Sequence, residues 1–203
     1  MKKIPTLFIR KFEDGKIVGI TKKVTPGMEW VLEGEGKATI KMDGACCAVI
    51  DGEFYKRFDA KPGRKIPEGA IPCCDPDPVT GHHPHWVKIS EKNPADKWFI
   101  KAYENTSMVY RTICVNDSYP EMKLKDGTYE AIGKHFNGNP YGLKDDKLLK
   151  HGDAKTYPIR SFDGIKAFLE CHDVEGIVFW KDGEPKCKIK RTDFGFEWPI
   201  RSN

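Results

Sequence analysis

Asp-Gly pairs between runs of strand-forming residues restrict the fold of this chain more than any other local feature. Ala45–Ile50 and Glu53–Phe58 are joined by Asp51-Gly52, and the turn Lys181-Asp182-Gly183-Glu184 joins Val174–Trp180 to Pro185–Arg191. An Asp-Gly pair favours a type I′ turn, whose twist matches that of two paired strands. Both segments are therefore predicted to be antiparallel hairpins.

A helix is predicted between the two hairpins. Ser161 is a suitable N-cap, Asp163 suits the positive end of the helix dipole in the first turn, and the helix is expected to end near His172. Its apolar residues recur at helical spacing, namely Phe162, Ile165, Phe168 and Leu169. Strands interrupted by occasional helices, without a βαβ rhythm, predict an α+β fold with mostly antiparallel sheets and flanking helices.

The chain is predicted to form a single domain over residues 1–203. Its 203 residues fit one domain, and 39% apolar content supplies a core. Residues 62–84 carry six of the fourteen prolines, which disfavours a central strand or a helix. That stretch is predicted to be a long surface loop.

Composition excludes several classes of protein. Charged residues make up 32% of the chain, and no apolar run approaches the roughly 18 residues that a membrane span needs. No secretory signal is evident behind the basic start, so a cytoplasmic location is expected, with no membrane partner. The seven cysteines are odd in number and lack a C-x-x-C pair, which favours reduced thiols. The net charge of +4 does not by itself indicate nucleic-acid binding.

Lys41-Met42-Asp43-Gly44 reads K-x-D-G at the end of a short predicted strand, Ala38–Lys41. Such a tetrapeptide arises by chance in a few per cent of chains of this length, and a solvated lysine before a turn explains it equally well. The rest of the chain changes that balance. Glu130 in E-x-x-G, Glu175 in E-G-I-V, and Lys188 with Lys190 in K-x-K follow Lys41 in this order.

This order resembles motifs I, III, IV and V of the covalent nucleotidyltransferases, which comprise DNA ligases, RNA ligases and mRNA capping enzymes. The likeness covers most of residues 29–200 and is strongest to a group of short ATP-dependent 5′-to-3′ RNA ligases with bacterial, viral and vertebrate members. The segments that carry this closer likeness are Cys46-Cys47, Asp51-Gly52, Tyr55–Arg57, Thr80–Val87, Asn137–Tyr141 and Lys190–Gly195.

Two departures from other members of the superfamily favour an RNA ligase. DNA ligases extend the motif to K-x-D-G-x-R, whereas this chain has Cys46 at the sixth position. DNA ligases and capping enzymes usually carry a C-terminal OB-fold, and the 13 residues after Lys190 are too few for a five-stranded barrel. We therefore expect a nucleotidyltransferase (ATP-grasp-like) domain without a C-terminal OB-fold.

The resemblance implies ATP-dependent joining of RNA 5′-phosphate and 3′-hydroxyl ends through a lysyl-AMP and an adenylylated RNA 5′ end. Lys41 is the implied nucleophile, and attack requires a neutral amine, which nearby positive charge or desolvation favours. Lys188 and Lys190 share one face of their strand with Lys186, while Cys187 and Ile189 face the other way. The two lysines are predicted to bind the α-phosphate and the departing pyrophosphate.

The carboxylates of Asp43, Glu130 and Glu175 are predicted to hold Mg²⁺, for which Mn²⁺ can substitute, through its water shell. Glu130 contacting the ribose instead stays an open alternative. Arg57 is preferred over Lys56, on the opposite strand face, as the substitute for the missing motif arginine. The remaining predicted nucleotide contacts are Thr39, the Ile40 backbone, Gly44, and an apolar face from Ile132, Phe136 or Phe179.

Three alternatives remain open. Cys73-Cys74 with His82, His83 and His85 could be read as a zinc site, but the spacing matches no familiar ligand pattern and favours a structured loop. A GTP-using capping-type enzyme would be labelled by GTP in preference to ATP. A catalytically silent RNA-end-binding module is disfavoured, because such a protein has little reason to keep the whole set of motifs.

Overall fold

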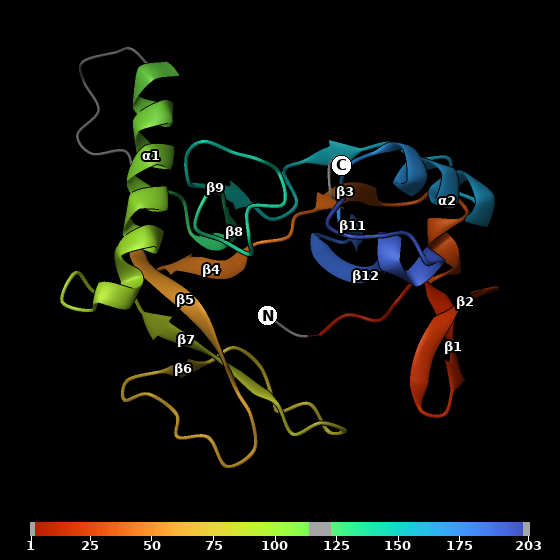
Figure 1. The fold of residues 1–203 in the computed structure, drawn as a ribbon, viewed down its shortest axis with the longest axis horizontal. Coiled ribbons are helices and arrows are strands. Elements are labelled where there is room, and N and C mark those ends of the chain that lie inside the picture. The colour runs from red at the N-terminus through yellow and green to blue at the C-terminus, as the bar shows by residue number, and fades with distance from the viewer. Residues whose placement is uncertain (1–2, 114–122, 201–203) are drawn as a thin grey trace. The chain divides into compact units, whose positions relative to one another are not determined.

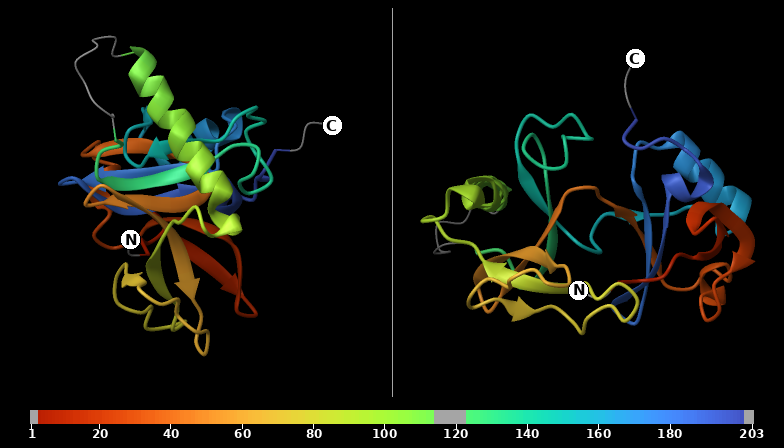
Figure 2. Two further views of the ribbon diagram at one scale, coloured as in Figure 1. Left: turned by 90° about the vertical axis from the view of Figure 1, so that its left-hand side faces the viewer. Right: turned by 60° about the horizontal axis from the view of Figure 1, so that its bottom comes forward.

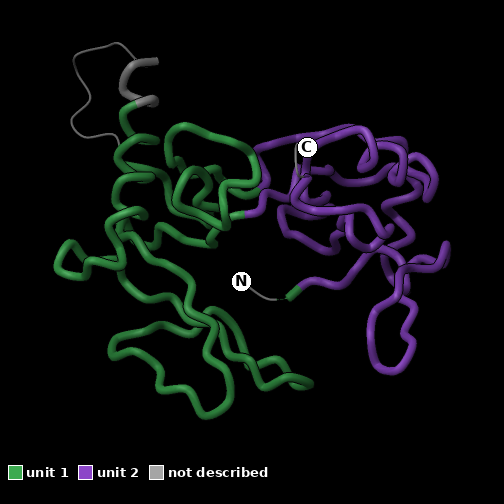
Figure 3. Tube along the Cα trace, in the orientation of Figure 1, with its two compact units in different colours: residues 1–3, 44–151 green, residues 4–43, 152–203 purple. Residues whose placement is uncertain are grey.

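The computed structural model describes residues 3–113 and 123–200. The chain divides into two compact units, of which one comprises residues 1–3 and 44–151 and the other residues 4–43 and 152–203 (Figure 3). The chain therefore passes from one unit to the other directly after Asp43, the third residue of K-x-D-G. Whether residues 1–203 fold as one domain stays a prediction.

The unit of residues 4–43 and 152–203 contains a four-stranded sheet in the order β10-β3-β11-β12 and the separate hairpin β1-β2 (Figure 1). One face of the sheet carries Ala38, Ile177 and Ile189, which pack against Ile165 and Leu169 of a helix. The elements are β1 (Phe8–Glu13), β2 (Lys16–Val24), η1 (Glu29–Val31), β3 (Lys37–Lys41), β10 (Lys155–Thr156), α2 (Phe162–Cys171), β11 (Gly176–Lys181), β12 (Glu184–Lys190) and η3 (Arg191–Phe194).

The unit of residues 44–151 contains a six-stranded sheet in the order β6-β7-β5-β4-β8-β9. The long helix α1 lies across one face of this sheet (Figure 2), where Ala102 packs against Cys47, Val49 and Leu148. The elements are β4 (Ala45–Ile50), β5 (Glu53–Ala60), β6 (Ile71–Pro72), β7 (His83–Lys88), η2 (Pro94–Asp96), α1 (Lys97–Ile113), β8 (Gly127–Ile132) and β9 (Lys147–Lys150).

The predicted α+β class with antiparallel sheets is confirmed, since every pairing between named strands is antiparallel. Both predicted hairpins form, and Asp51 and Asp182 have the positive φ angles, 52° and 54°, that a type I′ turn requires. The second hairpin is shorter than predicted, because β11 begins at Gly176 and β12 ends at Lys190.

The predicted helix is confirmed as α2. The Ser161 side chain accepts a hydrogen bond from the backbone N–H of Gly164, and His172 is the C-cap. The loop prediction for residues 62–84 is wrong at β6 and at the start of β7. Pro72 can join the sheet because β6 is an edge strand, where a missing N–H interrupts no ladder. No helix among the described residues is long and apolar enough to cross a membrane.

Candidate active site

Lys41 and Lys190 lie in one row across the four-stranded sheet. Gly176 of β11 pairs with Lys41 on one side and with Lys190 on the other. Directly paired residues of neighbouring strands point to the same face, so both lysines project from the face opposite α2. The predicted alternation of β12 is confirmed, because Cys187 and Ile189 belong to the core on the α2 side.

Glu175 connects these two lysines. One carboxylate oxygen of this buried side chain pairs with the Nζ atom of Lys41, and the other lies 2.5 Å from the Nζ atom of Lys190. The Glu175 side chain is 7% exposed, whereas those of Lys41 and Lys190 are 24% and 31% exposed. The Glu175 carboxylate therefore holds both amines in place. Because the lysine side chains are more exposed than the carboxylate, the amines remain accessible to an anion.

Lys188 adds a third cation on the same face. Burial, together with the positive charges of Lys41, Lys190 and Arg10, lowers the pKa of the Lys188 amine to about 8. Residues 5–7 lie beside β12 at this position. The backbone N–H of Lys188 donates a hydrogen bond to the carbonyl of Pro5, and the carbonyl of Lys188 accepts one from the N–H of Leu7. Arg10 is itself paired with Asp193, and the three lysines beside the single carboxylate of Glu175 leave a surplus of positive charge.

Asp43 is held by a residue that the sequence analysis did not identify. The indole N–H of Trp198 donates a hydrogen bond of 2.8 Å to an Oδ atom of Asp43. The two residues are 155 positions apart. No local pattern around Trp198 indicates this contact, which only the folded chain produces.

Two motif glycines are explained by close backbone approach. A Cβ atom at Gly44 would lie 2.2 Å from the carbonyl oxygen of Ala131, and one at Gly176 would lie 2.2 Å from that of Ile189. Any larger residue would therefore force neighbouring strands apart. Gly44 directly precedes β4 and lies against β8, so a glycine is needed at this position for the two strands to pack.

The residues predicted to meet adenine occupy different environments. Thr39 is 1% exposed, and its hydroxyl accepts a hydrogen bond from the indole N–H of Trp180 at 2.8 Å. The backbone N–H of Ile40 bonds to Ala154, so that donor is already used. Phe179 belongs to the core on the α2 side of the sheet, opposite the lysines. This placement favours a packing role for Phe179.

Glu130 and Ile132 lie on the face of the six-stranded sheet that points away from α1. Cys46 of β4 pairs with Glu130 of β8. On the other side of β4, Cys47 pairs with Lys56 of β5, so continuing the register by one residue places Arg57 beside Cys46. Lys56 points the other way and pairs with the buried Asp96, so the predicted division of Lys56 and Arg57 between opposite faces is confirmed. These positions place Glu130 and Arg57 on either side of Cys46.

Phe136 does not lie on that face. Its ring packs edge-on against Phe99 of α1, with ring centroids 5.1 Å apart, and it is 5% exposed. The side chain belongs to the core cluster beneath the helix. Ile132 is buried as well, at 3% exposed, so the two side chains differ in the sheet face that they occupy and not in their exposure.

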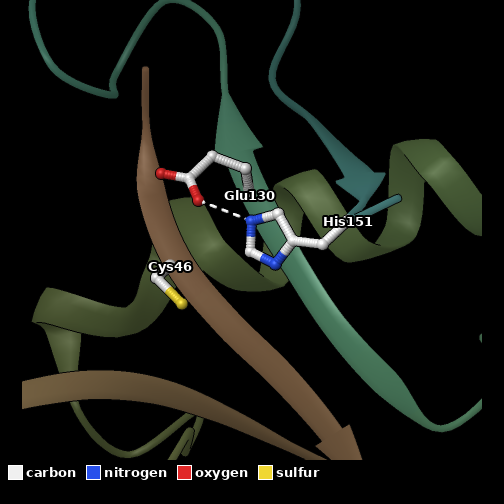
Figure 4. Close-up of side chains that lie close together, drawn as sticks. All are labelled: Cys46, Glu130 and His151. Atoms are coloured by element: carbon white, nitrogen blue, oxygen red, sulfur yellow. Dashed lines mark hydrogen bonds and ion pairs between the residues drawn. The ribbon is translucent and has the colours of Figure 1, made fainter. Parts of the chain in front are cut away.

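Glu130 is engaged by His151, the residue that follows β9. The imidazole Nε2 lies 2.8 Å from the Glu130 carboxylate (Figure 4), while Nδ1 lies 2.9 Å from the hydroxyl of Thr128. Cys46 completes a group of three ligand atoms within 4.8 Å of one another. Burial raises the pKa of the Cys46 thiol to about 12, and the nearby Glu130 charge adds to the shift.

The cation group around Glu175 fits a phosphate ligand, because three lysine side chains share one sheet face with a single carboxylate. Both oxygens of Glu175 are held by lysines and one of Asp43 by Trp198. Because Mg²⁺ keeps several waters in proteins, these carboxylates would contact the waters of the ion and not the ion itself.

The histidines of the loop have partners within the protein, as the preferred interpretation of a structured loop expects. The Nδ1 atom of His82 lies 3.1 Å from Asp59, and that of His85 lies 2.8 Å from the backbone oxygen of His83. Six cysteines of the described chain are free thiols, and Cys114 lies outside the described residues. Among the described residues, Cys46, Glu130 and His151 bring three possible metal-ligand atoms close together, and the sequence did not indicate these residues as a set.

Comparison with known proteins assigns a family. Residues 57–203 match the family model "RNA ligase 1". The chain is 28% identical to RNA ligase 1 of Danio rerio over 267 aligned positions, which cover 98% of this chain and 82% of that protein. It is 27% identical to RNA ligase 1 of Rattus norvegicus and 28% identical to that of Mus musculus, each over 80% of this chain and 68% of the relative. These matches show that the chain belongs to the RNA ligase 1 family.

Proposed function

We propose that this chain is an ATP-dependent ligase that joins RNA 5′-phosphate and 3′-hydroxyl ends through an AMP carried on Lys41. The observation that carries the proposal is the shared contact of Lys41 and Lys190 with the buried Glu175, beside Lys188. A nucleophilic lysine needs cations near its target phosphate, and this sheet face provides them. Family membership supports the RNA substrate class.

In the first step, the Lys41 amine attacks the α-phosphate of ATP and pyrophosphate leaves. Lys188 and Lys190 offset the negative charge that grows on the α-phosphate and on the departing pyrophosphate. The role of Glu175 is to hold the amines of Lys41 and Lys190 at fixed positions.

In the later steps, AMP passes from Lys41 to an RNA 5′-phosphate, and the 3′-hydroxyl of a second end displaces it. The same cations suit both transfers, because each develops charge on a phosphate. Bound Mg²⁺ would supply charge neutralisation, with Asp43 and Glu175 as its predicted water-shell partners and Glu130 as a third. Arg57 and Ile132 stay predicted nucleotide contacts, and a nucleotidyltransferase fold is part of this proposal.

The proposal is tested by incubating a 5′-phosphorylated RNA with the purified protein, Mg²⁺ and either ATP or GTP. We expect ATP to support circular or joined products and an adenylylated RNA intermediate, and Lys41→Ala to produce neither. The control variant is Lys166→Ala, because Lys166 is exposed on α2, which covers the opposite face of the sheet.

Three results would contradict the proposal. Joining by the Lys41→Ala variant would remove the assigned nucleophile. Preference for GTP would favour a capping-type reaction. RNA binding without joining, by a folded protein that carries no AMP and is supplied with either nucleotide, would favour an end-binding module.

A further inference from the structure

A second cluster of chemical groups lies on the open face of the six-stranded sheet. The Sγ atom of Cys46, a carboxylate oxygen of Glu130 and an imidazole nitrogen of His151 all lie within 4.8 Å of one another. The close-up view shows the Glu130 and His151 side chains joined by a hydrogen bond, with Cys46 beside them (Figure 4). All three are partly buried.

The mixture of donors distinguishes this cluster from a magnesium site. Mg²⁺ takes oxygen ligands, whereas a thiolate and an imidazole suit ions of the zinc class. Zinc is bound by cysteine, histidine and carboxylate ligands together, with tetrahedral geometry. Three protein ligands leave one position for water, which is the arrangement of an accessible zinc ion.

The backbone fixes two of the ligands relative to each other. Cys46 of β4 and Glu130 of β8 are directly paired in the antiparallel ladder, so their side chains leave the same face of the sheet. His151 lies next to β8, because its backbone N–H donates a hydrogen bond to the carbonyl of Thr128. Two strands and the residue after a third therefore supply the donors.

The orientation of the imidazole is fixed by a second contact. Nδ1 of His151 lies 2.9 Å from the Thr128 hydroxyl, which turns Nε2 toward Glu130. Metal-binding histidines usually engage their other ring nitrogen in such a hydrogen bond, which sets tautomer and ring orientation. Thr128 thus occupies the position of a supporting group behind a ligand.

The distances are close to those a bound ion would require. Zinc bonds of about 2.0–2.3 Å place tetrahedral donors about 3.4–3.6 Å apart. The Nε2 to Oε2 separation of 2.8 Å must widen slightly, and the thiol must move by about one ångström at most. Binding would replace the thiol proton, which leaves to solvent, and the His151 to Glu130 contact.

We propose that Cys46, Glu130 and His151 form a three-ligand site for a zinc-class divalent cation, with a fourth position open to water. This site shares Glu130 with the predicted magnesium role, adds the thiol of Cys46 and the imidazole of His151, and does not depend on ligase activity. Its ligands lie in the unit of residues 44–151 and share one sheet face.

The test is titration of the reduced, chelator-treated full chain with Co²⁺ in the absence of nucleotide. We expect one equivalent to produce a sulfur-to-cobalt charge-transfer band and the strong visible bands of tetrahedral cobalt, both removed by one equivalent of Zn²⁺. Cys46→Ser should lose the charge-transfer band, and His151→Gln should weaken binding more than tenfold. Cys171→Ser is the control, since Cys171 is an exposed thiol at the end of α2.

Variants of Thr128, which orients His151, distinguish a three-ligand site from binding of cobalt by the thiol alone. Thr128→Val should weaken cobalt binding by about 10–100-fold, and Thr128→Ser should restore it. Circular dichroism confirms folding, and His151→Gln serves if Cys46→Ser does not fold. Absence of a charge-transfer band in wild type overturns the proposal. Unchanged affinity in folded Cys46→Ser or in His151→Gln also overturns it.

Discussion

A motif carboxylate lies at the open face of each of the two sheets, and the groups around it differ. On the four-stranded sheet, Glu175 is paired with two lysines and a third lies beside them. On the six-stranded sheet, Glu130 is paired with one histidine and lies across from a cysteine. The first face carries permanent cations that suit a phosphate. The second carries ligands whose charge depends on a proton or a metal ion.

The motif carboxylates Glu175 and Glu130 therefore have different roles in balancing the charge around them. Glu175 is required to balance charge, because its removal leaves two amines facing each other. Glu130 has a partner that can become neutral by losing a proton, so its removal leaves little uncompensated charge.

Glu175→Gln is expected to have the largest effect. Removing one partner of a buried ion pair costs about 3–5 kcal/mol, and the partial exposure of the two lysines lowers this to about 2–3 kcal/mol. Urea denaturation at pH 7.5 measures the loss, and self-adenylylation should fall by at least about 100-fold. Glu130→Gln is the matched variant, with an expected loss below about 1 kcal/mol. An equal loss in both variants would contradict the contrast.

Lys190→Ala should slow self-adenylylation by about 100-fold, because one preorganised charge on the reacting phosphate is lost. Rapid-quench measurement with radiolabelled ATP follows this step. The matched control is Lys186→Ala, on the same strand and the same face but outside the contacts of Glu175. A similar rate loss in both variants would show that general positive charge, not position, matters.

Lys188→Met should stabilise the fold by about 1–2 kcal/mol at pH 7 while impairing adenylylation. The folded-state pKa of Lys188 is about 8, below its ordinary value of 10.5, so burying the charged amine costs free energy at low pH. The unfolded chain binds more protons between these two values, so wild-type stability rises from about pH 8 to 10.5. The advantage of the variant should fade over that window, as denaturation at several pH values will show. A constant difference would contradict the lowered pKa.

Trp198→Phe should have the smallest effect, a stability loss of about 0.5–1.5 kcal/mol and a few-fold slower adenylylation. The variant removes the indole N–H that bonds to Asp43. A double-mutant cycle with Asp43→Asn measures the coupling, which should be non-additive in adenylylation rate. Additive effects would show that Trp198 does not position Asp43.

Local patterns predicted the parts of the fold that depend on neighbouring residues. The Asp51-Gly52 turn and the Ser161 cap act within a few residues, and both are confirmed. The alternation of Lys188 and Lys190 against Cys187 also follows from strand geometry alone. Helix α1 was not identified from the sequence, and its apolar contacts lie on distant strands.

The candidate site was predictable only where motif order carried it. The sequence placed Glu175 and Lys190 near Lys41, and the structure brings these three side chains into contact. Trp198 and His151 carry no local signal, because their partners are 155 and 21 residues away. Phe136 was misleading for a physical reason, since an aromatic residue near a motif packs into a core as readily as against a base.

The most direct test is the intact mass of wild type and Lys41→Ala after incubation with Mg²⁺ and ATP or GTP, followed by peptide mapping. The account predicts one AMP on wild type from ATP, located at Lys41 and absent from the variant. Protein purified with AMP already attached should lose it on treatment with pyrophosphate and regain it with ATP. An adduct on another residue, or no adduct on a folded protein with either nucleotide and with Mn²⁺ also supplied, would contradict the central claim.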